Sequence, residues 1–191
     1  MDELRRHLER RRTILRSLFD PSPVLESLLA HGTAMETPTQ PWTEAERRLS
    51  ALIARLVRFR PAQCYANAQQ AVLLASQLGS VPARHTIEYW EGFAYLPVPA
   101  PFAHGWCVLN GRVWDLSMEH LGHNIGIGYL GMRIPSSYIK EAMIDRRTYA
   151  PLLHQWLRRL NGVDHAPVEP TGRGLSPLRA RGGLAGAPSR V

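Results

Sequence analysis

The strongest local constraint in this sequence is the dipeptide Asn110-Gly111, which stands between two apolar segments. Asn-Gly favours a two-residue turn because both positions tolerate a positive φ, so residues 104–109 and 112–116 are predicted to form a β-hairpin. In this hairpin Leu109 pairs with Arg112, and every other pairing follows from that one. The register then decides which side chains share a face of the sheet.

This register brings His104 close to Asp115. Trp106 lies opposite Asp115, and His104 lies two residues further along the same strand, so His104 and Asp115 are diagonal neighbours on one face. At that separation a carboxylate can hold one imidazole tautomer, stabilise the imidazolium and leave the other ring nitrogen for a thiol. Cys107 is an odd number of residues from His104 along the strand. Its side chain is therefore predicted to point to the other face of the sheet and to serve packing.

A second chemical feature is Cys64, in the first turn of a helix predicted from about Pro61 to Leu78. Unpaired backbone N–H groups and the helix dipole at that end favour a thiolate, and the same N–H groups can stabilise an oxyanion beside the sulfur. Arg58 and Arg60 lie just upstream and would add to this effect. A free cysteine is also a common small buried hydrophobe, so the position alone leaves both interpretations open.

The remaining pattern places helices before and after a set of strands. The predicted fold class is α+β: a helical N-terminal part, then a small antiparallel sheet, then C-terminal helices. Thr43 and Glu46 form a capping box, and Ser136 or Ser137 is the expected cap of a later helix. Besides the segments above, helices are predicted over about 4–18, 24–32, 43–60, 136–147 and 151–160, and strands over about 86–96 and 125–134.

Changes of composition divide the chain into three parts. Residues 1–42 are predicted to be a helical appendage that ends in a polar connector over residues 33–42. Residues 43–161 are the predicted α+β domain, and they carry all the chemical features described above. Residues 162–191 are rich in glycine and proline and have few large apolar side chains, so they are predicted to be disordered.

Composition excludes several classes of protein. Two cysteines make no disulfide framework, and no apolar run approaches the roughly 20 residues that cross a bilayer. The N-terminus is charged throughout and lacks the apolar core of a secretory signal, so the expected location is the cytoplasm. Much of the formal charge of +7 lies towards the two ends of the chain, which predicts solvated surface or weak, non-specific binding of polyanions such as nucleic acids.

Four segments occur in an informative order: QCYANAQQ, EGFAYLP, HGW and GRVWDLS. They resemble the papain-like and transglutaminase-like cysteine enzymes, especially small bacterial and phage members with a C-Y-x-N-A helix start and an H-A-W/D hairpin. The similar region covers about residues 60–135. The resemblance implies Cys64 as nucleophile, His104 as general base and acid, and Asp115 as the acid that orients the imidazole. Gly105 stands where the common H-A-W pattern has alanine. The pair of His104 and Asp115 is predicted to lie on the sheet face that meets the start of the Cys64 helix.

Three further residues are candidates for stabilising the oxyanion or positioning substrate: Gln63, Asn67 and Trp106. Papain-like enzymes often have an oxyanion-stabilising glutamine several residues before the cysteine, whereas Gln63 is immediately adjacent to it. Asn67 shares a helix face with Cys64 and can bond to substrate or act as a structural tie. Trp106 shares the face of His104, where it can shield the thiolate from water or serve as a core aromatic.

The expected function is that of a thiol-dependent hydrolase or acyltransferase that acts on an amide or peptide bond through a thioester. No cofactor and no metal are expected; the expected partner is the peptide or amide substrate, with no membrane and no nucleic acid beyond weak non-specific binding. Peptidase, amidase, transglutaminase-like and deamidase activities all stay open, as does the oligomeric state. The alternative is a catalytically inactive papain-like binding or scaffold protein whose basic termini bind polyanions weakly.

Other patterns are interpreted structurally. Residues 126–131 match GxGxxG, but a proline follows too soon for the helix that a dinucleotide site requires, so these glycines are predicted to mark bends or close backbone approach. Glu119, His120 and His123 lack a regular helical frame and a fourth ligand at zinc-site spacing, which predicts a polar loop. Glu91 is predicted to be a polar strand residue or a loop anchor rather than a second catalytic acid.

Overall fold

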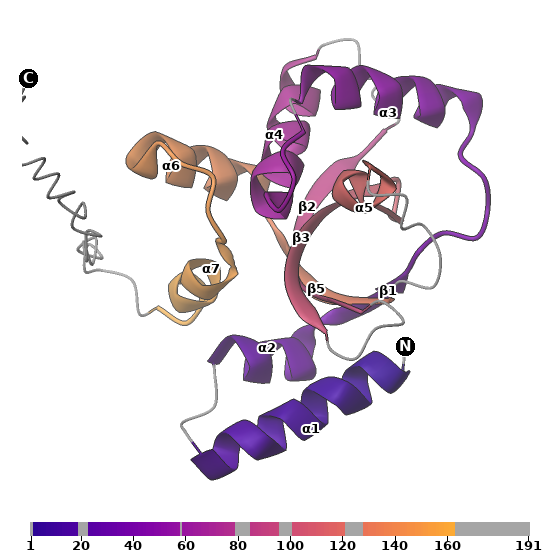
Figure 1. Ribbon diagram of the computed structural model, residues 1–191. Coiled ribbons are helices and arrows are strands. Elements are labelled where there is room, and N and C mark those ends of the chain that lie inside the picture. Colours follow the sequence, from indigo (N-terminus) through magenta and orange to yellow (C-terminus); the bar gives the residue numbers. More distant parts are fainter. Residues whose placement is uncertain are drawn as a thin grey trace, which may run out of the picture.

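The computed structural model of the protein describes residues 2–18, 23–57, 59–78, 85–95, 101–120 and 128–162. Within these ranges the chain forms seven helices and five strands (Figure 1). The helices are α1 (Asp2–Leu18), α2 (Pro23–His31), α3 (Glu44–Leu56), α4 (Cys64–Gln77), α5 (Leu116–His120), α6 (Ser136–Arg146) and α7 (Leu153–Leu160). The strands are β1 (Thr33–Glu36), β2 (Ile87–Tyr95), β3 (Phe102–Leu109), β4 (Arg112–Trp114) and β5 (Gly128–Ile134).

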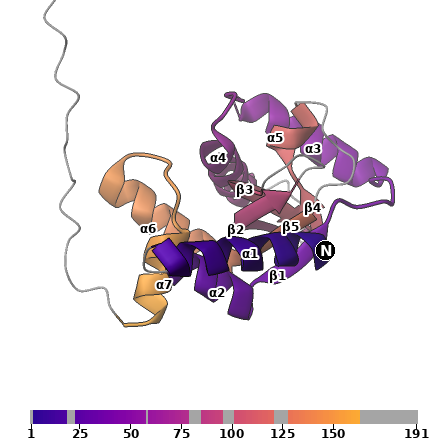
Figure 2. The same ribbon diagram turned by 60° about the horizontal axis from the view of Figure 1, so that its bottom comes forward.

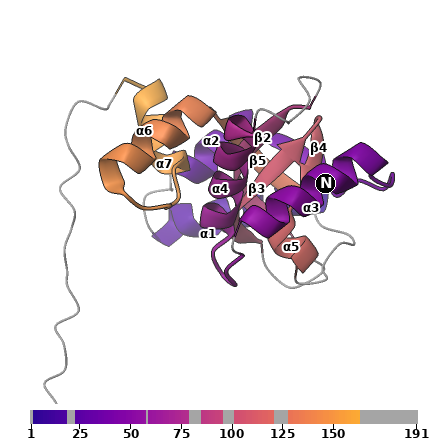
Figure 3. The ribbon, with the colours of Figure 1, turned by 90° about the horizontal axis from the view of Figure 1, so that it is seen from above.

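The described strands form one antiparallel sheet in the order β1-β5-β2-β3-β4. Helices come before and after the sheet in the chain, so the predicted α+β class is confirmed. The sheet is strongly curved, with a concave and a convex face (Figure 1). On the convex side α4 packs against β2 and β3, and α1 and α2 pack against β5 (Figure 2). Seen from above, α6 and α7 flank α4 on the side away from α3 (Figure 3).

Alternation along β3 divides its side chains between two hydrophobic clusters. Cys107 and Leu109 join the main core on the convex side, which also contains leucines of α1, α2 and α7. Trp106 joins a smaller cluster with Tyr129 on the concave side. Because His104 has the parity of Trp106, it belongs to the concave face. Burial on both faces explains why the polar side chains of β3 are few.

The hairpin has the predicted register. Leu109 pairs with Arg112 and Cys107 pairs with Trp114. Asn110 and Gly111 have φ values of 52° and 77°. A positive φ at both turn residues is the turn geometry that Asn-Gly favours between twisted strands. The prediction that depended most on local chemistry is therefore confirmed.

The segment after β4 differs from the prediction, because Leu116 begins α5 instead of ending a strand. Asp115 causes the change. Its Oδ1 accepts hydrogen bonds from the backbone N–H groups of Ser117 and Met118 at 3.1 and 3.2 Å. An aspartate that satisfies the free N–H groups of a first turn favours a helix at that point.

The capping box at the start of α3 is confirmed. The backbone N–H of Thr43 donates to Glu46 Oε2 at 2.8 Å, and the backbone N–H of Glu46 donates to Thr43 Oγ1 at 3.3 Å. The Glu46 carboxylate also accepts a hydrogen bond from Asn110 Nδ2 at 3.0 Å. One side chain therefore caps α3 and fastens it to the hairpin turn.

Three local predictions are wrong. Residues 33–36 are not part of a connector but form the edge strand β1, which pairs with β5. Four residues carry too little alternation to be distinguished from a loop. The helix predicted from Pro61 begins at Cys64, since the residues before it form a turn. The cap of α6 is Pro135, with no serine side-chain hydrogen bond at that end.

Two predictions lie outside the described residues: the strand residues 125–127 and the tail from residue 163 onwards. Leu4 and Leu8 of α1 are buried in the same core as the sheet. The division of the chain at residue 43 stays a prediction. None of the described helices is both long enough and apolar enough to span a membrane.

Candidate active site

Cys64 follows a tight turn. The backbone N–H of Gln63 donates to the carbonyl oxygen of Arg60 at 3.3 Å, and Ala62 has a φ of 58°. Pro61 suits the second position of such a turn, because its ring fixes φ. A positive φ at a residue other than glycine is uncommon and persists only where surrounding contacts fix the backbone. The turn sets the point at which α4 begins, with Cys64 as its first residue.

Asn67 supplies contacts that hold this turn. Its Oδ1 accepts a hydrogen bond from the Arg60 backbone N–H at 3.2 Å. Its Nδ2 donates to the Arg60 carbonyl oxygen at 3.0 Å and to Ser117 Oγ at 3.2 Å. Asn67 is buried, and both polar atoms of its side chain are bonded within the protein. Of the two interpretations left open by the sequence, these bonds support the structural tie, which fastens the cysteine turn and α5 to α4.

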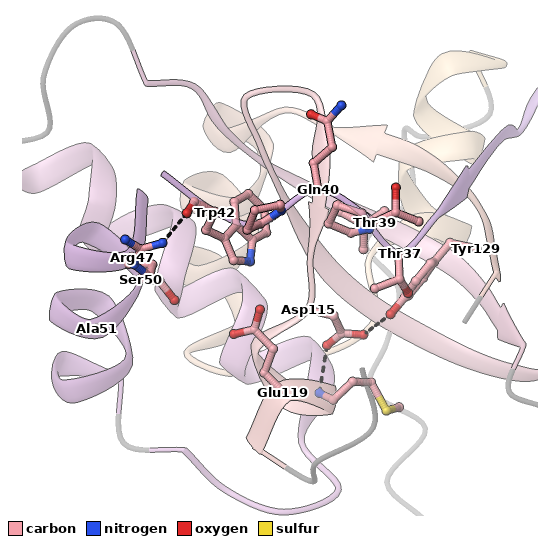
Figure 4. A pocket seen from close by; sticks show the side chains of 14 residues that line it. Thr37, Thr39, Gln40, Trp42, Arg47, Ser50, Ala51, Asp115, Glu119 and Tyr129 are labelled. Atoms are coloured by element: carbon pink, nitrogen blue, oxygen red, sulfur yellow. Dashed lines mark hydrogen bonds between the residues drawn. The ribbon is translucent and has the colours of Figure 1, made fainter. Parts of the chain in front are cut away.

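His104 and Asp115 form the predicted pair. His104 Nε2 lies 2.6 Å from Asp115 Oδ2, and the two residues are only 2% and 6% exposed. Tyr129 on β5 donates its hydroxyl to the same Oδ2 at 2.8 Å (Figure 4). Together with the two backbone N–H groups of α5, these contacts fix the position of the carboxylate. Sequence reasoning missed Tyr129, because no local spacing relates β5 to the hairpin.

Cys64 reaches His104 at the edge of β3. Because β4 pairs only with residues 107–109, residues 102–106 of β3 have a neighbour on the β2 side alone among the described strands. At this edge the Cys64 thiol lies near the His104 imidazole and the backbone N–H of Gly105, and both of these groups lower its pKa. Since Nε2 of His104 faces Asp115, the nitrogen towards Cys64 is Nδ1. The side chains therefore follow the order thiol, imidazole, carboxylate.

The start of α4 meets His104, but the body of this helix lies on the opposite face of the sheet. The body of α4 packs on the convex face, where Cys107 Sγ donates to the carbonyl oxygen of Ala68 at 3.4 Å. His104 points to the opposite, concave face. Cys64 meets it only because Cys64 is the end residue of α4 and lies at the edge of the sheet. Cys64 thus approaches His104 and Asp115, on the concave face, from the end of a helix that packs on the convex face.

The two sulfur atoms have opposite electrostatic environments. Burial raises the pKa of the Cys64 thiol, but the hydrogen bond and charge of His104, with the backbone N–H groups of Gly105 and Tyr65, lower it by more. The net pKa of Cys64 is therefore below its ordinary value. Burial raises the pKa of Cys107 well above the ordinary value. Cys107 is a buried, packed thiol, as its predicted position on the other face of the sheet implies.

The pKa of His104 moves in the direction opposite to that of Cys64. Burial lowers the pKa of His104, whereas the hydrogen bonds and charges of Asp115 and Cys64 raise it to about 9. A lowered thiol pKa beside a raised imidazole pKa favours transfer of the thiol proton to the imidazole. The Arg60 guanidinium, expected to support the thiolate, lines a neighbouring cavity, and Arg58 lies outside the described residues.

Gly105 is required by the close approach of α4 to β3. A Cβ at this position would lie 2.8 Å from Tyr65 Cδ1, 3.2 Å from Tyr65 Cα and 3.1 Å from the Tyr89 hydroxyl oxygen. The first turn of α4 therefore packs directly on the backbone of β3, and this contact brings the Gly105 N–H to Cys64. The glycine in place of the alanine of the H-A-W pattern has a steric reason in this chain.

We expect Gly105→Ala to displace the start of α4 from β3. The overpacking should lower the free energy of unfolding by about 1–3 kcal/mol. Alkylation of Cys64 at pH 6 should slow, because the thiolate loses its N–H donor and its alignment with His104. Gly111→Ala is the control: its Cβ meets nothing within 4 Å, but its φ of 77° makes it strained. Urea unfolding and alkylation rates should show lower stability for both variants and slower alkylation for Gly105→Ala alone.

Trp106 and Gln63 lie on different sides of the site. The Trp106 ring stacks on His104, with ring centroids 6.3 Å apart and an angle of 12° between the planes. It is 1% exposed and belongs to the concave cluster, so it both shields the imidazole and fills the core. A Cβ at Gly131 would collide with Trp106, which confirms close approach as the role of that glycine. Gln63 is exposed at the N-cap of α4, and its oxyanion role stays a prediction.

Glu91 is an anchor. Its carboxylate accepts hydrogen bonds from the backbone N–H of Leu152 at 2.7 and 2.9 Å and from that of Leu153 at 2.8 Å. The Tyr89 hydroxyl donates to it at 2.5 Å. Burial raises the pKa of Glu91 to about 7. Glu91 therefore caps the start of α7 and ties that helix to the sheet, which confirms the predicted loop anchor.

A cavity of about 640 Å³ lies beside Asp115, between α5, Tyr129 and the segment that precedes α3 (Figure 4). Glu119 lines it, and burial and the charge of Asp115 raise the pKa of Glu119 to about 7. In the part of the chain that the structure describes, no three His, Cys, Asp or Glu side chains gather in a way that could hold a metal ion. His123 and Gly126 lie outside the described residues, whereas Gly128 begins β5.

Comparison of the chain with protein-family models, with curated proteins and with solved structures finds no match. The resemblance to papain-like and transglutaminase-like enzymes therefore depends on the four sequence segments and on the arrangement of Cys64, His104 and Asp115.

Proposed function

We propose that this protein is a thiol-dependent hydrolase or acyltransferase that acts on an amide or peptide bond through a thioester. The observation that carries the proposal is that His104, the imidazole that lowers the pKa of the Cys64 thiol, lies 2.6 Å from the Asp115 carboxylate. A nucleophile, a base and an orienting acid in hydrogen-bond contact are the arrangement that activates a thiol. Both cysteines are free, which suits a reducing compartment such as the cytoplasm.

The proposed reaction begins when the Cys64 thiolate attacks the carbonyl carbon of the amide. The oxyanion that forms can accept hydrogen bonds from the N–H groups at the start of α4 and from that of Gly105. As the carbon–nitrogen bond breaks, the His104 imidazolium gives its proton to the leaving amine, and a thioester remains. His104 then takes a proton from water or from an acceptor amine that attacks the thioester, and the thiolate leaves. Asp115 keeps the imidazole oriented throughout.

The second candidate is a catalytically inactive protein of the same architecture that binds a partner. In that case Cys64 would be an ordinary thiol and the site would serve only packing. Weak polyanion binding by the basic termini would show as retention on DNA or RNA that falls steeply with salt. The ionisation of Cys64 distinguishes the enzyme from the binding protein.

The test is the pH dependence of iodoacetamide alkylation at each cysteine, followed by peptide mass spectrometry. We expect Cys64 to react well below pH 8, because the imidazolium lowers its pKa. The ion pair should persist as the pH rises until His104 loses its proton near pH 9. Cys107 should not react in the folded protein. If Cys64 titrates no lower than a free thiol, at about pH 8.5, the proposed enzyme function is contradicted.

A further inference from the structure

A cavity of about 540 Å³ lies beside the turn that carries Cys64. Gln63 and Tyr65, the residues on either side of Cys64, both line it, as does Arg60 from the same turn. The segment that follows α6 forms another part of the wall. Cys64 itself does not line the cavity, so a side chain attached to a carbonyl at its sulfur would reach the cavity past Gln63 or Tyr65. The cavity is distinct from the larger one beside Asp115.

The charged residues that line this cavity are both cationic, Arg60 and Arg147. Both are exposed, and among the described residues neither guanidinium forms an ion pair. Arg146, the preceding residue, lines a different cavity together with Glu141 and Asp145. The acidic side chains near the end of α6 thus belong to another surface, and the cavity beside Cys64 has a net positive charge.

Both arginines extend from fixed backbone. The N–H and the carbonyl of Arg60 are bonded to the buried Asn67 side chain. Arg147 has a φ of 53° at the end of α6, where its N–H donates to the carbonyl oxygen of Met143 at 2.8 Å. Guanidinium groups present planar sets of donors that match a carboxylate. The fixed backbone holds the Cα atoms of the two arginines in place, which reduces the backbone entropy lost on binding.

We propose that this cavity selects acyl substrates with an acidic side chain, of the glutamate or aspartate type, next to the carbonyl that Cys64 attacks. This inference rests on the proposed function and names its substrate class. A neutral side chain would leave the two guanidinium groups without a partner, and a basic side chain would be repelled. Thr148 and Gln63 add hydrogen-bonding groups to the same walls, and the Tyr65 ring can cover the aliphatic part of the side chain.

Two alkylating probes that differ in one charge test the inference: the α-amides of N-iodoacetyl-glutamate and N-iodoacetyl-glutamine. Each places its side chain a short distance from the carbon that Cys64 attacks. At low ionic strength we expect the glutamate probe to alkylate Cys64 about 10-fold faster than the glutamine probe, and the advantage to shrink at high salt. A change in the reactivity of the Cys64 thiol affects both rates equally, so it leaves their ratio unchanged.

Substitution of the arginines should remove the preference. Arg60→Gln and Arg147→Gln should each reduce the ratio about threefold, and the double variant should bring it close to one. Arg146→Gln, which changes the same charge on the neighbouring cavity, should leave the ratio as in the wild type. Equal rates for the two probes in the wild type, or a preference that survives the double substitution, would overturn the inference.

The outcome is separable from that of the proposed function. Cys64 can be alkylated at pH 8.5 even if its pKa is ordinary, so the ratio is measurable in either case. A low pKa for Cys64 with no charge preference overturns the substrate class and leaves the enzyme function standing. An ordinary pKa for Cys64 contradicts the enzyme function. Because the substrate class rests on that function, it then fails too, whatever the ratio of the two alkylation rates.

Discussion

Replacing His104 by alanine is expected to slow the alkylation of Cys64 by iodoacetamide at pH 6 about 100-fold. Burial alone raises the pKa of the thiol, and His104 is the group that reverses this effect most strongly. A thiol with an ordinary pKa is only about 0.3% ionised at pH 6, so little thiolate remains without the imidazolium. Turnover of any amide that the wild-type protein cleaves should be abolished, and Cys64→Ala should abolish it as well, because nucleophile and base act as a unit.

Cys107→Ala is the matched control for this prediction. Cys107 is buried on the opposite face, with its sulfur against the carbonyl oxygen of Ala68. Its replacement should lower the free energy of unfolding by about 1–2 kcal/mol through lost packing and leave the kinetics unchanged. Equal alkylation of the wild type and His104→Ala, or a loss of reactivity in Cys107→Ala, would contradict the assignment of Cys64 as the nucleophile.

The parts of the site that could be predicted are those governed by local chemistry. Asn110-Gly111 requires a particular turn, the turn sets the strand register, and the register brings His104 to Asp115. The parity of Cys107 follows from the same register. Thr43 and Glu46 form their capping box because its partners are only three residues apart. Each of these predictions needs information from a few neighbouring residues alone.

The parts that could not be predicted depend on how distant segments pack. Tyr129 reaches Asp115 from β5, which is separated from β3 by β2 in the sheet. Nothing in the sequence spacing relates these strands. The position of α4 on the convex face, with Cys64 at the sheet edge, depends on the space that Gly105 leaves for Tyr65. A glycine in a strand indicates close approach of something, but it does not say which segment approaches.

Asp115→Asn is expected to slow turnover by about 10²–10⁴-fold while the protein stays folded. Asparagine keeps an oxygen that can accept the N–H groups of Ser117 and Met118, so the cap of α5 can survive. Its amide nitrogen, however, is a donor. If it donates to Nε2 of His104, the ring proton must move to Nδ1, the nitrogen that faces Cys64, and the imidazole can then no longer accept the thiol proton.

The same substitution should also change the pH dependence of the site. Burial lowers the pKa of His104, and the hydrogen bond that the imidazole donates to Asp115 is the largest of the influences that raise it to about 9. Without the carboxylate, the pKa of His104 falls, so the imidazole takes the thiol proton less readily and the thiolate of Cys64 forms only at a higher pH. The alkylation profile of Asp115→Asn should therefore approach that of a free thiol. Asp145→Asn removes an exposed carboxylate of α6 and should behave as the wild type. A wild-type profile for Asp115→Asn would show that the carboxylate does not control the imidazole, and the triad assignment would lose its third member.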